Sequence, residues 1–294
     1  MATKAPLNLW LELTEACQYK CRFCYNYWRE TPPAGHVGMS GPTADNVISF
    51  LQRCGAAYRC VVALAGGDPT AHPDFLGIAL RAAAVADEVT VVTHGGNISA
   101  PQLIALSELE NLTIQFSVPS LDVERYRFLT GSGDLGQVMT AILMCRELSI
   151  PVSLSVVVTD LNKGDLTAMV DLAAAVEAEY LILNRFLSSG RGVLYEQQFA
   201  ISAAAFEQAL ATAREVGRSR GVRLLASGNN PDIRQLKASE PKLTISTRGE
   251  IRLCSLVSDV VATLQQDPGD VVEQCTAFWQ SSKPLEGCAC ASRL

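Results

Sequence analysis

Short runs rich in β-branched residues alternate with longer alanine-rich runs of helical period, and this alternation restricts the fold more than any other feature of the chain. Strands are predicted at Leu7–Leu13, Arg59–Ala65, Glu88–Thr93, Leu112–Val118, Val152–Thr159 and Tyr180–Phe186. Helices are predicted between and after them, at Thr43–Cys54, Pro73–Val85, Ala100–Leu106, Asp134–Leu148, Leu166–Ala178 and Ser202–Ser219. Such units predict an α/β fold, with a parallel sheet, right-handed crossovers and functional groups at the carboxyl ends of the strands.

A cysteine loop begins three residues after the first predicted strand. Cys17, Cys21 and Cys24 have a C-x3-C-x2-C spacing. Three thiolates from one short loop can hold three irons of a [4Fe-4S] cluster and leave the fourth iron open to another molecule. Zinc is the alternative, but zinc sites favour cysteine pairs in twos, and no second pair follows within about thirty residues.

Composition is that of a globular protein. The chain has 294 residues, 48% of them hydrophobic and 18% charged, which fits one large domain or a large domain with a small one. The N-terminus lacks a basic segment followed by a long apolar one, and no later stretch of about eighteen residues is free of charges and helix breakers, so neither secretion nor membrane spanning is expected. Ten cysteines without an export signal indicate the reduced cytoplasm and metal sites. The net charge of −6 argues against nucleic acid as a partner and mildly favours a cationic substrate.

The cysteine loop resembles the signature of the radical S-adenosylmethionine (radical SAM) enzymes. The resemblance implies an open, partial (β/α)6 barrel, a [4Fe-4S] cluster on the three loop cysteines and S-adenosylmethionine as cofactor. It also implies that Phe23 lies against the adenine and that an external one-electron donor of the flavodoxin or ferredoxin type is a partner.

Residues at other strand ends extend the resemblance. Gly66-Gly67-Asp68-Pro69 resembles the family's Gly-Gly-Glu-Pro motif, which implies that the first three hold the amino group of the SAM methionine, with aspartate one methylene shorter than the usual glutamate. The further cofactor-binding candidates are Ser117, Asn184 and Arg191. For each of these three, a capping or turn role is an equal alternative.

The last part of the chain differs from the barrel, so residues 1–220 are predicted as the barrel and 221–294 as an extension. Short strands are expected within Gly221–Ala226 and Lys242–Leu253, with a hairpin turn at Thr247–Glu250, and a helix at Asp270–Ser281. Four cysteines fall here, at Cys254, Cys275, Cys288 and Cys290. The arrangement resembles a shortened SPASM or twitch extension, which houses a second [4Fe-4S] cluster, although one usual cysteine ligand is absent.

Two ligand sets remain open for that second cluster. Either all four tail cysteines bind it, or Cys275, Cys288 and Cys290 do and Cys254 stays a free thiol. The remaining cysteines, Cys54, Cys60 and Cys145, are expected to be buried as small hydrophobic residues.

The role of Cys254 would decide the reaction. If a substrate radical loses an electron to the second cluster, the product is oxidised. If a thiol returns a hydrogen atom from the opposite face, the carbon is inverted, and the enzyme is an epimerase. We assign Cys254 as the hydrogen donor.

The overall plan resembles the radical SAM epimerases and dehydrogenases of aminoglycoside biosynthesis, with a cysteine loop like that of the neomycin-type C-5‴ epimerases. That resemblance implies a small polycationic substrate. Acidic residues near the barrel mouth would then bind its amines, and the candidates are Glu12, Glu15, Asp122 and Glu196. A radical SAM dehydrogenase, a peptide-modifying radical SAM enzyme and a non-catalytic iron–sulfur or zinc protein are the alternatives.

Overall fold

The computed structural model describes residues 4–26, 38–227, 241–256 and 259–280. Its strands are β1 (Pro6–Thr14), β2 (Arg59–Gly66), β3 (Glu88–Thr93), β4 (Leu112–Ser117), β5 (Val152–Val158), β6 (Leu181–Arg185), β7 (Leu224–Ser227), β8 (Lys242–Ile245), β9 (Glu250–Arg252) and β10 (Val260–Thr263). Its α-helices are α1 (Gly41–Ala57), α2 (Phe75–Ala83), α3 (Ala100–Leu106), α4 (Val123–Thr130), α5 (Leu135–Glu147), α6 (Leu166–Ala175), α7 (Glu196–Phe199), α8 (Ala203–Arg220) and α10 (Pro268–Gln280). Short 3-10 turns complete it at η2 (Pro69–Ala71), η3 (Lys163–Asp165) and η4 (Gly190–Tyr195).

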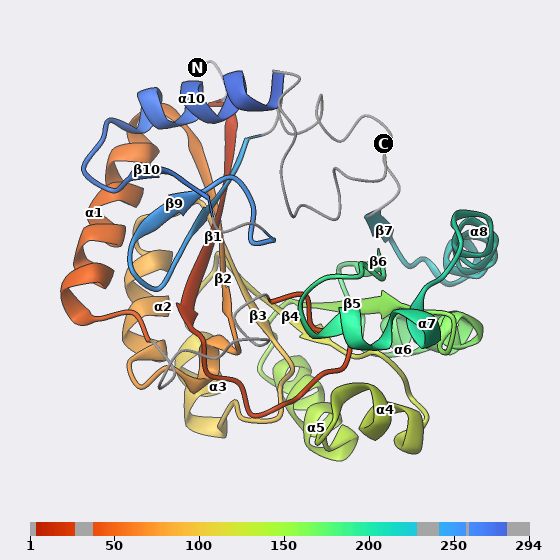
Figure 1. The fold of residues 1–294 in the computed structure, drawn as a ribbon. Coiled ribbons are helices and arrows are strands. Elements are labelled where there is room, and N and C mark those ends of the chain that lie inside the picture. Colours follow the sequence, from red (N-terminus) through yellow and green to blue (C-terminus); the bar gives the residue numbers. More distant parts are fainter. Residues whose placement is uncertain (1–3, 27–37, 228–240, 257–258, 281–294) are drawn as a thin grey trace.

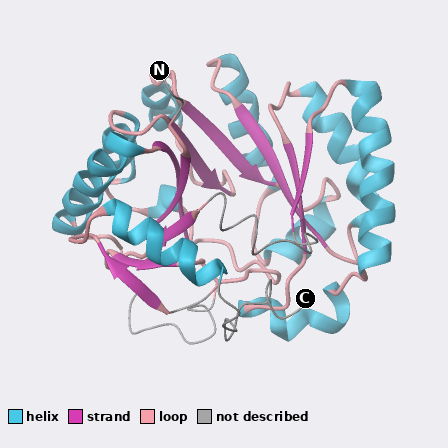
Figure 2. Cartoon of the chain, turned by 90° about the horizontal axis from the view of Figure 1, so that it is seen from above, coloured by secondary structure: helices cyan, strands magenta, loops and turns pink. Residues whose placement is uncertain are grey.

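The described strands form one ten-stranded sheet in the order β10-β9-β8-β1-β2-β3-β4-β5-β6-β7. From β1 to β7 every neighbouring pair is parallel. The order is linear, so the sheet curves around an interior without closing, with helices on its outer side (Figures 1 and 2). This is the α/β fold that the sequence predicted.

Alternation along β1 shows why the sheet has two different faces. Leu7, Leu9, Leu11 and Leu13 are buried against the helices, each at 1% exposure or less. Successive side chains of a strand point to opposite faces, so the residues between these leucines face the interior of the sheet. The leucine face anchors β1 in the hydrophobic core, and the other face is left for polar groups.

All six predicted strands and all six predicted helices are present, with ends shifted by a few residues. The helix α4 was not predicted. Its sequence Val-Glu-Arg-Tyr-Arg-Phe-Leu-Thr lacks a continuous apolar stripe, and it buries only Tyr126, Leu129 and Thr130. Asp122 caps its start by accepting a hydrogen bond from the backbone N–H of Arg125 at 2.7 Å. Aspartate at this position is a local N-cap signal, and the sequence reading passed over it.

The tail hairpin joins the barrel sheet directly. Strand β8 pairs parallel with β1, and β9 pairs antiparallel with β8. The turn between them contains Gly249 with φ of +79°, which confirms the predicted hairpin turn. Strand β10, which the sequence reading missed, then extends the sheet by one more antiparallel partner. The tail therefore continues the edge of the barrel at β1.

Cys54, Cys60 and Cys145 are completely buried, as predicted. Among the helices that the structure describes, none is both long enough and apolar enough to cross a lipid bilayer.

Candidate active site

A cavity of about 420 Å³ opens at the carboxyl ends of the parallel strands. It brings together the predicted residues Cys17, Cys21, Phe23, Cys24, Gly66, Gly67, Asp68, Ser117, Asn184 and Cys254. These residues come from the cysteine loop, from the ends of β2, β4 and β6, and from the segment after β9. Residues separated by more than 230 positions in the chain thus line one space.

The cysteine loop is held in place by backbone hydrogen bonds to the end of α4. The N–H of Lys20 donates to the carbonyl of Thr130 at 3.0 Å, and the N–H of Arg22 donates to that of Leu129 at 2.8 Å. Phe23 packs against the small cluster of Leu129, Phe186 and Phe199 while it lines the cavity. The unpredicted helix α4 is therefore the support on which the loop rests.

The Ser-Gly-Arg-Gly segment of η4 supports the loop from its other side. Gly190 has φ of +54°, and a Cβ there would lie 2.5 Å from the backbone carbon of Tyr25. The N–H of Gly192 donates to the carbonyl of Cys24 at 3.3 Å. Arg191, predicted to bind the cofactor, does not line the cavity. Its segment touches the loop through glycine backbone, because only a residue without Cβ fits so close to another chain.

The three loop cysteines fit the implied [4Fe-4S] cluster. Each is half-buried, and all three line the cavity. Within the described residues no three His, Cys, Asp or Glu side chains converge as ligands of a single metal ion. In a cluster each thiolate binds a different iron, so the sulfurs need not meet at one point.

The Gly66-Gly67 turn lies against the start of the cysteine loop. Gly66 has φ of +124°, and a Cβ there would lie 2.4 Å from the carbonyl oxygen of Thr14. A Cβ on Gly67 would lie 2.1 Å from the carbonyl oxygen of Ala16. The N–H of Asp68 also donates to that Ala16 oxygen at 2.8 Å. Both glycines are required for this close approach of two backbone segments.

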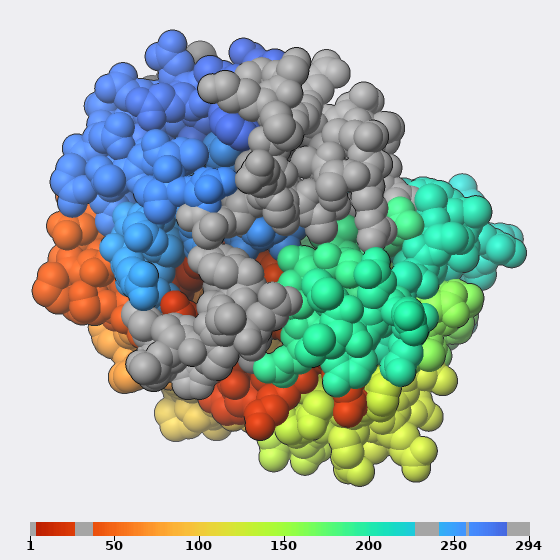
Figure 3. Space-filling model, in the orientation of Figure 1, coloured from red at the N-terminus to blue at the C-terminus, as the bar shows by residue number. Residues whose placement is uncertain are grey.

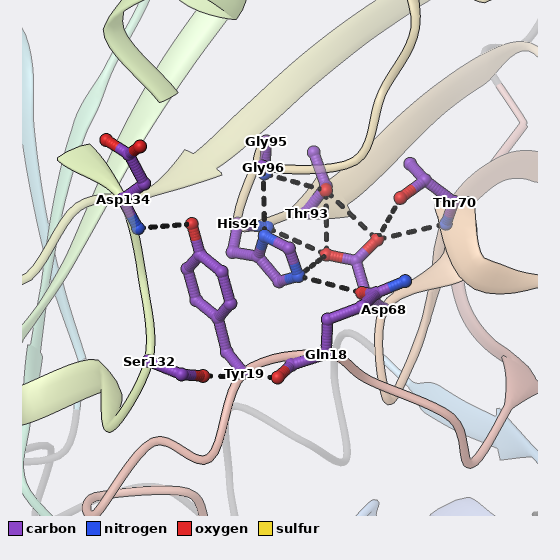
Figure 4. A network of polar contacts seen from close by, with 10 residues as sticks. All are labelled: Gln18, Tyr19, Asp68, Thr70, Thr93, His94, Gly95, Gly96, Ser132 and Asp134. Carbon is purple, nitrogen blue, oxygen red and sulfur yellow. Dashed lines mark hydrogen bonds and ion pairs between the residues drawn. The ribbon is translucent and has the colours of Figure 1, made fainter. Parts of the chain in front are cut away.

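Asp68 is the centre of a polar network (Figure 4). Its carboxylate accepts hydrogen bonds from the backbone N–H of Thr70 at 3.0 Å, from Oγ1 of Thr93 at 2.8 Å and from the N–H of His94 at 3.0 Å. Asp68 is 1% exposed, and its oxygens are already occupied by the chain itself. This carboxylate therefore fixes the geometry of the glycine turn, and its predicted contact with the SAM amino group stays a prediction.

Tyr19 and His94 belong to the same network, although the sequence reading passed over both. Their rings stack with centroids 3.7 Å apart, and Nδ1 of His94 accepts from the N–H of Gly96 at 2.9 Å. An accepting Nδ1 places the ring proton on Nε2, which lies 3.1 Å from Oδ2 of Asp68. The signal available in the sequence was Thr93-His94-Gly95-Gly96, a polar segment directly after a parallel strand.

Cys254 and its neighbours join the tail to this site. Cys254 is buried, at 8% exposure, and lines the cavity together with Ser255. Ser255 forms a side-chain hydrogen bond with Tyr25 of the cysteine loop, and burial raises the pKa of that tyrosine. The segment after β9 is thus fixed to the loop that carries the cluster ligands.

The four acidic residues predicted to bind substrate do not line the cavity. Glu12 is buried in an ion pair with Arg252, and Asp122 caps α4. Glu196 is exposed at the start of α7, and Glu15 is half-buried outside the lining. Glu12 and Asp122 thus have contacts within the fold, and the role of the four carboxylates in binding substrate stays a prediction.

The cavity also contains two basic side chains, Arg185 and Lys242. Arg185 lies at the end of β6, where the sequence placed it at the barrel mouth, and the sequence reading missed Lys242. Arg185 donates to the carbonyl of Ile201 at 2.8 Å, and the Lys242 ammonium lies 4.3 Å from the centre of the Trp10 ring. Among the described residues that line the cavity, Asp68 is the only carboxylate.

The other predicted cluster ligands are placed only in part. Cys275 lies in α10, is 1% exposed, and burial raises the pKa of its thiol to about 12. Cys288 and Cys290 lie outside the described residues. The second ligand set stays a prediction.

A family model, curated relatives and solved structures all relate this chain to radical SAM proteins. Residues 11–173 match the family model described as the radical SAM superfamily. The sporulation killing factor maturation protein SkfB of Bacillus subtilis is 24% identical over 63% of this chain and 44% of its own length. A probable GTP 3′,8-cyclase of Pyrococcus abyssi is 27% identical over 58% of this chain and 54% of its own length. The chain spans about half the length of these relatives.

Solved structures agree on the fold. The crystal structure of Streptococcus suis SuiB bound to S-adenosylmethionine superposes with a TM-score of 0.76 at 15% identity, covering 91% of this chain and 65% of SuiB. SuiB has also been solved with its precursor peptide SuiA.

Proposed function

The chain belongs to the radical SAM superfamily, and from that membership we propose that it is an epimerase-type enzyme in which Cys254 returns a hydrogen atom to a substrate carbon. The superfamily uses S-adenosylmethionine, a [4Fe-4S] cluster and an external electron donor. When bound, the cluster and SAM together supply a 5′-deoxyadenosyl radical that removes a hydrogen atom from an unactivated carbon.

One observation carries the proposal: the thiol of Cys254 lines the same cavity as the three loop cysteines. Cys254 comes from the tail hairpin and the loop from the end of β1, so a substrate between them would have different groups on its two faces. A hydrogen atom removed on one face and returned on the other inverts the carbon. The chain contributes the S–H bond, and the thiol sulfur becomes a radical that an electron and a proton must restore.

Replacement of the thiol tests this role. Cys254→Ala should still cleave SAM and should accumulate 5′-deoxyadenosine without inverted product. In deuterated water the wild-type product should carry deuterium at the inverted carbon. Cys145→Ala is the matched control, because that thiol is equally buried but lies away from the cavity. Loss of iron from Cys254→Ala would contradict the donor role and make this cysteine a ligand of a second cluster.

For the substrate, a peptide is better supported than the aminoglycoside that the cysteine loop suggested. The relatives include a maturation protein and a structure with a precursor peptide bound.

The aminoglycoside remains the second candidate, because the Cys21–Arg29 stretch resembles the corresponding loop of the neomycin-type epimerases. The deuterium assay separates the two. Precursor peptides and paromomycin are incubated in parallel with SAM and dithionite in deuterated water. Label in the peptide alone supports the first substrate class, and label in paromomycin alone supports the second.

In the same proposal a second [4Fe-4S] cluster would be bound by Cys275, Cys288 and Cys290. Iron analysis of the reconstituted protein tests it, with about eight irons per chain expected for two [4Fe-4S] clusters against about four for one. Replacement of all three tail cysteines should remove about four irons, those of the second cluster, and leave the first cluster in place.

A further inference from the structure

A surface patch lies on the cysteine loop and on the two elements that support it. It consists of the basic residues Lys20, Arg22 and Arg127 and the apolar residues Phe128, Val193 and Leu194, and we call it the loop patch. All are exposed except the half-buried Arg22, and none of them lines the cavity. We propose that the loop patch is the docking site of the external electron donor, a small acidic one-electron carrier protein. The proposal needs the family's electron donor but does not depend on how the substrate radical ends.

Charge is the first argument. The chain as a whole carries −6, yet three cations gather here. Neither Lys20 nor Arg127 forms an ion pair within the part of the chain that the structure describes. The acidic residues of α4, Asp122 and Glu124, lie at the opposite end of that helix. An acidic partner would be repelled by most of this protein and attracted to the loop patch, which directs its encounter.

The backbone holds these cations in place. Lys20 and Arg22 are hydrogen-bonded through their N–H groups to Thr130 and Leu129, at the carboxyl end of α4. That end of a helix carries partial negative charge, which stabilises cations beside it. The Arg22 guanidinium also lies 4.0 Å from the centre of the Phe128 ring and 5.5 Å from that of Tyr195, so it is held against the surface.

Exposed apolar area is the second argument. Phe128, Val193 and Leu194 are 38%, 51% and 77% exposed. They come from α4 and η4, the two elements that support the cysteine loop. Large apolar side chains beside fixed cations form the usual composition of a protein–protein interface. Figure 3 shows the red atoms of the N-terminal segment reaching the surface next to the teal atoms of the segment around residue 195.

Position is the third argument. Arg22 directly follows Cys21 and precedes Phe23 and Cys24, whose side chains line the cavity on the inner side of the same loop. A carrier on the loop patch would be separated from the cluster ligands by the thickness of one loop. It would pass one electron inward and be oxidised by one electron, while SAM and substrate stay in the cavity.

The experiment compares two sources of electrons. The double variant Lys20→Glu/Arg127→Glu should raise the KM for a flavodoxin, reduced by NADPH and its reductase, by about tenfold or more in SAM cleavage. The rate with dithionite should not change, because dithionite needs no docking site. Leu194→Glu should act in the same direction.

Direct binding gives a readout that does not depend on turnover. The Kd of oxidised flavodoxin, measured by calorimetry, should rise to the same extent, and the wild-type Kd should weaken as salt is added. Arg218→Glu on α8 and Ile104→Glu on α3 are the matched controls, since both are exposed and lie on other elements. They should bind flavodoxin normally.

Two results would contradict the proposal that the electron donor docks on the loop patch. Unchanged flavodoxin binding in the double variant would place the donor elsewhere. An equal loss of SAM cleavage with flavodoxin and with dithionite would mean that these residues support the cluster loop and not a partner. Absence of SAM cleavage by the wild-type protein with dithionite would instead contradict the proposed function.

Discussion

Arg252 at the end of β9 donates a hydrogen bond to Oε2 of Glu12 in β1, and only 1% and 4% of these two side chains are exposed. Strand β8 lies between the two strands, so the ion pair spans it. Cys254 follows two residues after Arg252. The position of the proposed hydrogen donor is therefore fixed to the first strand of the barrel, which leads into the cysteine loop.

Removing one partner of this pair should be costly. Above about pH 7, where Glu12 is ionised in the fold, Glu12→Gln leaves a buried guanidinium without its counter-ion, and such changes cost about 3–5 kcal/mol of unfolding free energy. The double variant Glu12→Gln/Arg252→Met should recover a large part of that loss, because no unpaired charge remains. Urea denaturation of the two single variants and the double variant measures the coupling. Additive losses would mean that the pair does not act as a unit.

Glu12 also predicts how stability changes with pH. Burial raises its pKa from 4.5 to about 7, although the neighbouring Arg252 acts in the opposite direction. Between these values the folded protein holds a proton that the unfolded chain releases, so the free energy of unfolding falls as pH rises. The contribution is complete below pH 4.5 and gone above about 7, with a slope of at most about 1.4 kcal/mol per pH unit.

The matching measurement is urea denaturation from pH 4.5 to 8. The wild-type protein should lose stability across this window relative to Glu12→Gln/Arg252→Met, in which the group is absent. Parallel curves for the two proteins would show that Glu12 keeps an ordinary pKa in the fold.

Gly66 should tolerate no side chain. Its φ of +124° and the 2.4 Å approach to the Thr14 oxygen predict that Gly66→Ala loses about 1–3 kcal/mol of stability, or more if the turn moves. SAM affinity should fall with it, because the turn lines the cavity. Gly164→Ala is the control, since nothing lies within 4 Å of its Cβ. Thermal unfolding and SAM titration follow both effects, and a Gly66→Ala protein with normal values of each would contradict the argument.

Asp68→Asn should disturb the cavity without changing its size. Asparagine replaces one of the two accepting oxygens by an NH2 group, so either the Thr70 N–H, which donates to Oδ1, or the His94 N–H, which donates to Oδ2, loses its acceptor. An unsatisfied buried donor costs about 1–3 kcal/mol. Weaker SAM binding is expected. Asp87→Asn is the control, because Asp87 accepts a backbone hydrogen bond at 2.7 Å from Cys60 but does not line the cavity. Equal SAM affinities in the two variants would leave Asp68 without a specific role.

The strands and helices of the barrel could be predicted from the sequence, because the period of their hydrophobic residues and their length distinguish strands from helices. In β1 and in the alanine-rich helices, the local secondary-structure preference and the burial pattern of the final fold agree. Placement of the cysteine loop and of the Gly66-Gly67 turn at one edge follows from parallel pairing alone.

Interactions between distant segments could not be predicted in this way. The ion pair of Glu12 joins residues 240 positions apart, which no local pattern specifies. Lys242 was missed for the same reason, because its strand reaches the cavity only by pairing with β1. The cap formed by Asp122 is a local signal, but the sequence reading gave that residue another role.

The parallel pairing of β8 with β1 brings the segment that carries Cys254 to the cavity beside the cysteine loop, although 230 or more positions separate the two in the chain. Under the proposed function, the β8–β9 hairpin could be exchanged at this edge of the sheet without change to the strands and the loop that would hold the first cluster. Different products could then evolve by replacement of the segment that quenches the substrate radical.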